Sequence, residues 1–189
     1  AYIFSLDDGE WIQQAKLIAE DADAFDEFGV SVSISGDYAV VGTPYNDDDG
    51  ENSGSAYIFS LDDGEWIQQA KLTAEDADAG GLFGNSVTIS GDCAIVGARG
   101  DDDDGESSGS AYKFSFYDGE WTQQAKLTAE DADENDRFGT SVSISGDYAI
   151  VGAWGGDDEY GSAYIYHSPI EEEEDEEEED GEWMEQAKL

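Results

Sequence analysis

The chain has 189 residues and carries 48 Asp and Glu against 7 Lys and Arg, a formal net charge of −41. This negative field repels phosphate, which argues against nucleic acid and anionic membrane surfaces as partners, and no apolar run is long enough to insert into a membrane. Hydrophobic residues make up 39% of the sequence, too many for a wholly disordered acidic chain, and a single cysteine excludes an internal disulfide framework.

The sequence is a repeat. The phrase AYIFSLDDGEWIQQAKL occupies residues 1–17 and recurs unchanged at 56–72, and a variant follows at 111–127, each step being 55 residues. A fourth copy starts at Ala163, is interrupted by an acidic run and resumes at 181–189. A period of this length indicates a repeat architecture rather than ordinary globular domains.

Each full period contains four short runs that we predict to be strands, named A to D in chain order. Strand A alternates Val or Ile with Ser, so its two faces differ, and the other three are rich in β-branched and aromatic residues. Gly36-Asp37 and Asp63-Gly64 are expected as hairpin turns. The four runs of the first full period are 31–35, 37–42, 55–61 and 66–72.

Four antiparallel strands per repeat are typical of a β-propeller blade, so the sequence predicts an all-β fold. The chain opens with strands C and D and then gives A to D three times, about three and a half blades. We therefore expect either a longer protein or copies that assemble. Within a single repeat domain, 1–189, the expected units are a half blade with its loop at 1–27, blades at 28–82 and 83–137, and a blade at 138–189 with an acidic insertion at 169–180.

The pairs Phe28-Gly29, Phe83-Gly84 and Phe138-Gly139 each precede strands A and B, which end in Gly-Thr-Pro, Gly-Ala-Arg or Gly-Ala-Trp. In these phrases the chain resembles FG-GAP repeats of the bacterial type, over essentially its whole length apart from the glutamate insertion. Such repeats build the propeller of integrin α subunits and of many microbial surface proteins, usually with seven blades. The resemblance implies an extracellular or cell-surface adhesion module, often stabilised by calcium, rather than an enzyme.

One departure from that family concerns calcium. Integrin α repeats carry their calcium loop between strands A and B, where this chain has only Ser-Gly-Asp, as at Ser35-Gly36-Asp37. One aspartate cannot supply the six to eight oxygens that calcium prefers. The usual site of the family is therefore not carried over.

Two loops between strands B and C nevertheless have the composition of a hard-cation site, because carboxylates flank a glycine that permits a sharp turn. The loop between strand D and the next strand A should lie beside them. The expected calcium ligands are Asp47, Asp49, Glu51, Asp102, Asp104 and Glu106 in the B–C loops and Asp21, Asp76 and Asp131 in the D–A loops. The alternative is a solvated acidic surface that binds no specific ion.

Other charged features invite simpler interpretations. The acidic run at 171–180 replaces a hairpin turn and is expected to be a solvated loop, with a loose calcium sponge as the alternative. Arg99-Gly100-Asp101 spells an integrin-recognition tripeptide, which we attribute to drift between repeats. The recurring cations are expected to pair with acids on the exposed face, where each pair contributes little; they are Lys16, Lys71, Lys126 and Lys188.

No set of residues predicts catalysis. His167 is the only histidine and Cys93 replaces a tyrosine of the sister repeats, so neither a Ser-His-Asp set nor a zinc site can be assembled. A tryptophan recurs at the start of strand D, and recurrence at one position favours packing between blades over sugar binding. These tryptophans are Trp11, Trp66, Trp121 and Trp183.

The sequence thus favours a non-enzymatic module outside the cell that binds a protein or carbohydrate ligand, or copies of itself, with calcium as the expected ion. Two alternatives stay open. Near-identical repeats that stack in one dimension would suit a subunit of an extracellular filament. The chain would also suit an accessory domain of a larger secreted enzyme.

Overall fold

The computed structural model describes residues 1–155, 160–167 and 183–189, so the predicted acidic insertion lies outside the described residues. Within this part, fourteen strands form one two-stranded and three four-stranded antiparallel sheets, which confirms the all-β fold of blades led by a half blade. It contains no helix long and apolar enough to cross a membrane. The strands are β1 (Tyr2–Asp7), β2 (Glu10–Lys16), β3 (Ser31–Ser35), β4 (Tyr38–Thr43), β5 (Ser55–Asp62), β6 (Glu65–Leu72), β7 (Phe83–Ser90), β8 (Cys93–Ala98), β9 (Ser110–Tyr117), β10 (Glu120–Leu127), β11 (Ser141–Ser145), β12 (Tyr148–Ala153), β13 (Ser162–His167) and β14 (Met184–Lys188).

Each sheet is a meander in which strands that follow one another in the chain pair side by side. Short turns join strand A to B and strand C to D, and the long acidic loops join B to C at the opposite edge. Asp63 and Gly64 have φ values of 45° and 86°, the two positive values of a type I′ hairpin turn. The predicted turn chemistry is therefore confirmed at this position.

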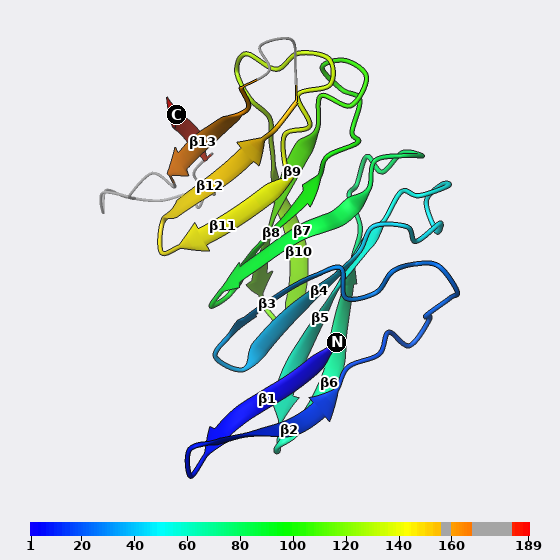
Figure 1. Ribbon diagram of the computed structural model, residues 1–189, viewed down its shortest axis with the longest axis vertical. Coiled ribbons are helices and arrows are strands. Elements are labelled where there is room, and N and C mark those ends of the chain that lie inside the picture. The colour runs from blue at the N-terminus through cyan, green and yellow to red at the C-terminus, as the bar shows by residue number, and fades with distance from the viewer. Residues whose placement is uncertain (156–159, 168–182) are drawn as a thin grey trace.

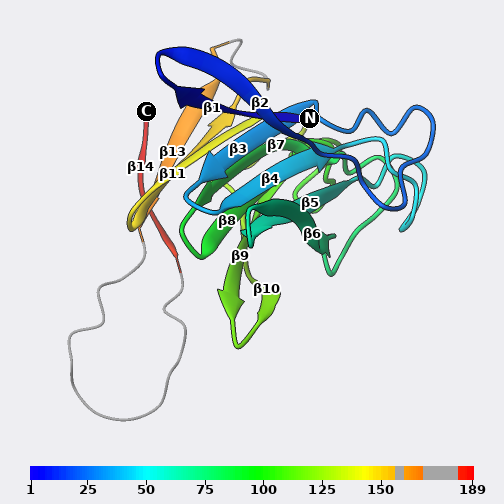
Figure 2. The same cartoon turned by 90° about the horizontal axis from the view of Figure 1, so that it is seen from below.

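The blades stack face to face, and the hydrophobic core lies between them (Figures 1 and 2). Val40 and Ile58 of the β3–β6 blade pack in one cluster with Val87 and Val96 of the β7–β10 blade. A second cluster joins that blade to the β11–β14 blade in the same way. Because a single sheet cannot bury both of its faces alone, each blade depends on its neighbours.

Serines of strand A connect one blade to the next. β3 lies beside β7, and β7 lies beside β11. The Ser31 hydroxyl donates to the Gly84 carbonyl at 2.7 Å, and Ser33 Oγ accepts the Ile89 N–H at 3.3 Å. The alternating serines therefore have a specific role. Their hydroxyls bond backbone groups of the next blade's strand A, where no β-ladder joins the two blades.

The Phe-Gly pair lies at a close approach between the backbones of adjacent blades. The Phe83 ring packs on Tyr112 at a centroid distance of 5.5 Å, within its own blade. Gly84 has φ of 89°, and a Cβ there would lie 2.2 Å from the Ser55 carbonyl oxygen of the preceding blade. A Cβ on Gly42 would lie 1.9 Å from the Gly84 oxygen. Only glycine fits both sides of this contact.

Candidate functional site

Lysine ammonium groups organise the acidic loop edge. A register shift between Ile58 and Phe59 places Lys71 of β6 directly opposite Tyr57 of β5. The ammonium lies 5.3 Å from the centre of the Tyr57 ring and donates to Asp21 at 2.6 Å and to Asp48. Asp21 belongs to the loop that follows the half blade, whereas Asp48 belongs to the B–C loop of the same blade as Lys71. One cation therefore joins two loops and two blades.

The next blade repeats this arrangement with one more carboxylate. Lys126 of β10 donates to Asp76 at 2.6 Å, to Asp101 at 3.2 Å and to Asp103, and it lies 5.3 Å from the Tyr112 ring centre. The Tyr112 hydroxyl donates to Asp101 at 2.9 Å. Asp101 is the most enclosed of these acids, with a side chain only 12% exposed.

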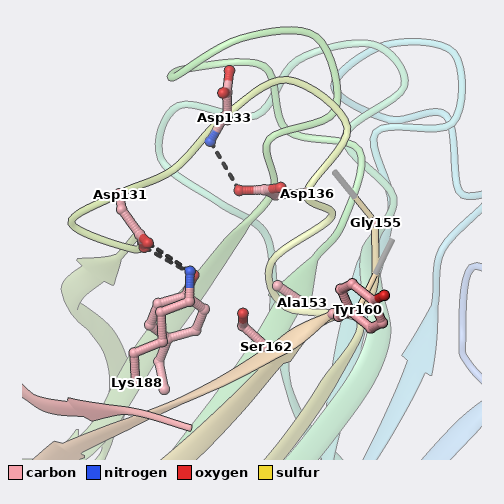
Figure 3. A pocket seen from close by; sticks show the side chains of 10 residues that line it. Asp131, Asp133, Asp136, Ala153, Gly155, Tyr160, Ser162 and Lys188 are labelled. Carbon is pink, nitrogen blue, oxygen red and sulfur yellow. Dashed lines mark hydrogen bonds and ion pairs between the residues drawn. The ribbon is translucent and has the colours of Figure 1, made fainter. Parts of the chain in front are cut away.

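The last blade repeats the lysine–aspartate pair beside a cavity (Figure 3). Lys188 donates to Asp131 at 2.6 Å and lies 5.4 Å from the Tyr164 ring, whose hydroxyl donates to Asp131 at 2.9 Å. A cavity of about 310 Å³ adjoins this pair and is lined also by Asp136 and Tyr160. Residues 156–159 of this blade's B–C loop lie outside the described residues.

The three D–A loop aspartates and their lysines stay charged over a wide pH range. Partial burial opposes ionisation of Asp21 and Asp76, but the hydrogen bonds from lysine, tyrosine and the backbone, together with the lysine charge, outweigh it and lower the pKa of each carboxyl. The hydrogen bond from Lys188 likewise lowers the pKa of Asp131. Burial raises the pKa of the Tyr57 hydroxyl to about 12, so this ring stays neutral beside the ammonium.

The nine predicted calcium ligands fall into three groups. Those of the D–A loops, Asp21, Asp76 and Asp131, bind the lysine ammonium groups. Asp47 and Asp102 accept backbone N–H groups of Asn52 and Ser107 at 2.7 and 2.6 Å, and so shape their own loops. The remaining four are exposed in the B–C loops: Asp49, Glu51, Asp104 and Glu106.

No three Asp, Glu, His or Cys side chains gather as a metal shell within the described ranges. The lysine ammonium occupies the position between the D–A and B–C loops where the sequence predicted calcium. The predicted common shell is therefore not assembled, and calcium binding by the four exposed acids stays a prediction.

The recurring lysines are the feature of the sequence that indicates these sites. Pairing of the recurring lysines with acids is confirmed for Lys71, Lys126 and Lys188, but the expected exposed location is wrong for two of them. The side chains of Lys71 and Lys126 are only 21% and 19% exposed, because the aspartate loops and a tyrosine ring cover them. A lysine that recurs at one position in a chain with so few cations was the signal.

The remaining side chains of interest have structural roles. The Asp101 carboxylate accepts hydrogen bonds from Ser110, Tyr112 and Lys126, so the Arg-Gly-Asp tripeptide does not present a free aspartate. Burial raises the pKa of Cys93, and the His167 ring lies 4.4 Å from that of Tyr148.

Packing of the recurring tryptophans is confirmed for three of the four. Trp121 contacts Tyr38 of the preceding blade at a ring distance of 5.7 Å, and Trp66 and Trp183 pack against the core clusters. Trp11 is instead 70% exposed. It stands on the half blade, where no preceding blade of the described chain covers it.

Comparisons with known proteins bear on the fold and the family. A family model described as FG-GAP repeat matches residues 11–59, 66–114 and 121–166, most of the chain. No curated protein matches. The crystal structure of the Saccharomyces cerevisiae Sqt1 is similar, with a TM-score of 0.51 and 11% identity over 87% of this chain and 37% of that one. The chain thus spans well under half the length of Sqt1, and at this identity the likeness concerns the fold alone.

Proposed function

Because the chain belongs to the FG-GAP repeat family, we propose that it is a non-enzymatic recognition module that acts outside the cell and binds a protein or carbohydrate ligand. FG-GAP repeats commonly occur in extracellular proteins, which supports the location. The observation that carries the proposal is the loop edge itself. In the β3–β6 and β7–β10 blades two sets of loops meet there, and a lysine joins them.

The geometry of the loops favours a binding role over a merely solvated surface. The Asp47 carboxylate closes the B–C loop on the Asn52 N–H, and Lys71 ties that loop to the preceding blade through Asp21. A loop fixed in this way loses little conformational entropy when it binds, so rigid loops on a sheet scaffold make good contact surfaces. The exposed carboxylates beyond the lysines favour a ligand of positive charge.

We expect calcium to bind at the surface, between the exposed acids and a ligand, rather than inside the fold as a structural ion. Of the nine predicted ligands, the four that bind neither a lysine nor a backbone N–H in the described part of the chain are the exposed Asp49, Glu51, Asp104 and Glu106. Carboxylate oxygens are the ligands that calcium prefers, and an ion held there would also attract an anionic carbohydrate. We expect weak binding, since the four side chains do not converge on one point.

Two variants test the site. In the first, the four exposed acids are neutralised as Asp49→Asn, Glu51→Gln, Asp104→Asn and Glu106→Gln. In the matched control, four exposed acids at the opposite edge are neutralised as Asp7→Asn, Asp62→Asn, Glu65→Gln and Glu120→Gln, giving the same net charge. Both are compared with the unmodified chain by calcium calorimetry at constant ionic strength and on panels of glycans and basic proteins. Binding lost only in the first variant supports the proposal, and equal binding by both variants would refute it.

A filament subunit is the second candidate, favoured by exposed apolar faces at both ends of the stack. Ile150 is 40% exposed at one end, whereas Val40 and Ile95 at the matching positions are fully buried between blades. Negative-stain microscopy at high protein concentration decides this question. Monodisperse particles would contradict the filament, and long thin rods would support it.

A further inference from the structure

Two loops of the acidic edge share one backbone arrangement but differ in charge. They are the B–C loops of the first and second full blades, at 44–54 and 99–109. The segment that enters the next blade holds each of them in the same way. The Leu82 N–H donates to the first loop at 3.1 Å, and the Arg137 N–H donates to the matching carbonyl of the second loop at 3.0 Å. Any difference in ligand binding between the two loops therefore comes from their side chains.

The second loop differs from the first by two arginines, which are the only ones in the chain. Arg99 opens the second loop, where the first loop has Pro44. Arg137 lies on the adjoining segment, where the matching segment has Leu82. Both arginine side chains are partly exposed. Every ion pair in the described ranges of the chain belongs to a lysine, so neither guanidinium group is neutralised by an acid there.

One side-chain amide connects the backbones of the two arginines. Asn85 accepts the Arg99 N–H at 3.0 Å and donates to the Thr140 carbonyl at 3.2 Å. The Thr140 hydroxyl in turn donates to the Arg137 carbonyl at 2.7 Å. The first loop lacks this connection, because Pro44 has no N–H to donate. Both arginines are therefore fixed at one junction, between the second and third full blades.

An aromatic ring orders one of the two guanidinium groups. The Arg137 guanidinium carbon lies 4.8 Å from the centre of the Trp154 ring, a cation–π contact. A side chain held in this way loses less conformational entropy when it binds a ligand. Guanidinium groups recognise carboxylates through two parallel hydrogen bonds, which a lysine cannot form. The junction thus presents groups suited to a carboxylate.

The acids around this junction exclude a purely anionic ligand. The chain has a net charge of −41, and Asp104 and Glu106 of the second loop are exposed. A Cβ built on Gly105, between them, would lie 3.3 Å from the Cα of Glu134, so a third acidic residue adjoins the tip of the loop. A ligand that satisfies both the acids and the arginines carries positive charges together with a carboxylate.

We propose that the second loop, with Arg99 and Arg137 beside it, binds a segment of a basic polypeptide that carries a carboxylate among its cationic side chains. The carboxylate pairs with the guanidinium groups, and the cationic side chains pair with Asp104 and Glu106. This inference rests on the proposed function, because it requires that the acidic loops bind a ligand of positive charge. A polypeptide fits better than a carbohydrate, since acidic carbohydrates carry few cationic groups.

Paired peptides test the proposal by fluorescence anisotropy titration against the folded chain. The peptides alternate Gly and Lys, and one Gly at a time is replaced by Asp in one set and by Asn in the other. Net charge alone predicts that the Asn peptide binds more tightly at every position, because the Asp peptide is less basic. We expect the opposite at the position that reaches the arginines, where the Asp peptide should bind about tenfold more tightly.

Substitution of both arginines should abolish this preference. Arg99→Gln combined with Arg137→Gln should still bind the Asn peptides, which shows that the variant is folded, but should bind the Asp peptides more weakly at every position. The matched control is Lys16→Gln combined with Lys113→Gln, which has the same net charge and should keep the preference for Asp. The proposal is wrong if the unmodified chain prefers Asn at every position, or if the preference for Asp survives the loss of both arginines.

A third variant separates this inference from the proposed function. Asp104→Asn combined with Glu106→Gln should weaken the binding of both peptide sets. If it does, and the unmodified chain still prefers Asn at every position, the proposed function stands and the inference fails. If only glycans bind, the ligand is not a polypeptide and the inference fails again. If neither peptides nor glycans bind, the proposed function fails together with the inference.

Discussion

The Lys71 and Lys126 sites are two copies of one arrangement that differ at one loop position. Where the first has Asn46, whose amide oxygen accepts from Ser55 at 2.9 Å, the second has Asp101, which accepts from Ser110, Tyr112 and Lys126. The Tyr57 hydroxyl, at the position of Tyr112, has no hydrogen-bond partner in the described part of the chain. One carboxylate therefore both satisfies a buried hydroxyl and adds charge beside the lysine.

The comparison indicates that the contribution of each lysine to stability depends on how many carboxylates it neutralises. Lys126 faces three aspartates, one of them largely enclosed, and Lys71 faces two that are about half exposed. Removing a cation from enclosed acids leaves charges that water cannot solvate well, whereas exposed acids are screened. The two blades should therefore respond differently to the same substitution.

The largest effect is expected for Lys126→Met, which should lower the free energy of unfolding by about 2–3 kcal/mol, against about 1–2 kcal/mol for Lys71→Met. Urea unfolding followed by tryptophan fluorescence measures both. Lys16→Met is the control, because Lys16 lies 6.0 Å from the Tyr2 ring and pairs with no acid of the described chain. Equal losses for all three variants would mean that net charge alone matters.

The stability difference between the unmodified chain and Lys126→Met should depend on pH. Asp76 has a lowered pKa in the folded state, so its contribution is present above the ordinary value of 3.8 and is lost as the pH falls below it. Lys126 has a raised pKa, so its contribution is present below 10.5 and is lost as the pH rises above that value.

Unfolding titrations at several pH values measure this difference directly. The subtraction cancels the general relief of self-repulsion in acid, which affects both proteins. A difference that stayed constant from pH 7 to below pH 3 would exclude an ionic role for the pair.

A smaller effect is expected for Asp101→Asn, which converts the second site into the composition of the first. It should cost about 1 kcal/mol, because the Tyr112 hydroxyl loses its acceptor. The reverse change, Asn46→Asp, should give the Tyr57 hydroxyl a partner and stabilise the chain by less than about 1 kcal/mol. Melting temperatures that moved in the same direction for both variants would contradict this assignment.

The smallest expected effect is a difference in the pH at which Tyr57 and Tyr112 ionise. Burial raises the pKa of Tyr57 to about 12, and burial together with the Asp101 carboxylate raises that of Tyr112 further. Ultraviolet titration of Tyr57→Phe and Tyr112→Phe variants identifies each group by subtraction. Tyr57 should titrate first, and the opposite order would contradict the role of Asp101.

Much of the fold follows from local sequence rules. The alternation of Ser with Val and Ile in 31–35 and the Asp63-Gly64 turn each suffice to place a strand or a hairpin, because backbone geometry dictates them. The loop edge where acids gather follows from strand order alone. Because the repeats share these patterns, the same strands and turns are predicted in every blade.

The site itself was harder to predict for a physical reason. The register shift that sets Lys71 opposite Tyr57 depends on one extra residue in strand D, which the alternation of side chains does not reveal. Whether the D–A and B–C loops hold an ammonium or a metal ion depends on whether the fold places a lysine side chain between them. The acidic composition predicts that the loops bind a cation, but it does not show whether that cation is a lysine or a metal ion.

The central claim, that lysines join adjacent blades through the acidic loops, is tested most directly by a double-mutant cycle of Lys126→Met and Asp76→Asn. The two side chains belong to different blades and meet at 2.6 Å. The account predicts a coupling energy of about 1 kcal/mol or more in urea unfolding at neutral pH. A coupling near zero, with the two losses simply adding, would contradict it.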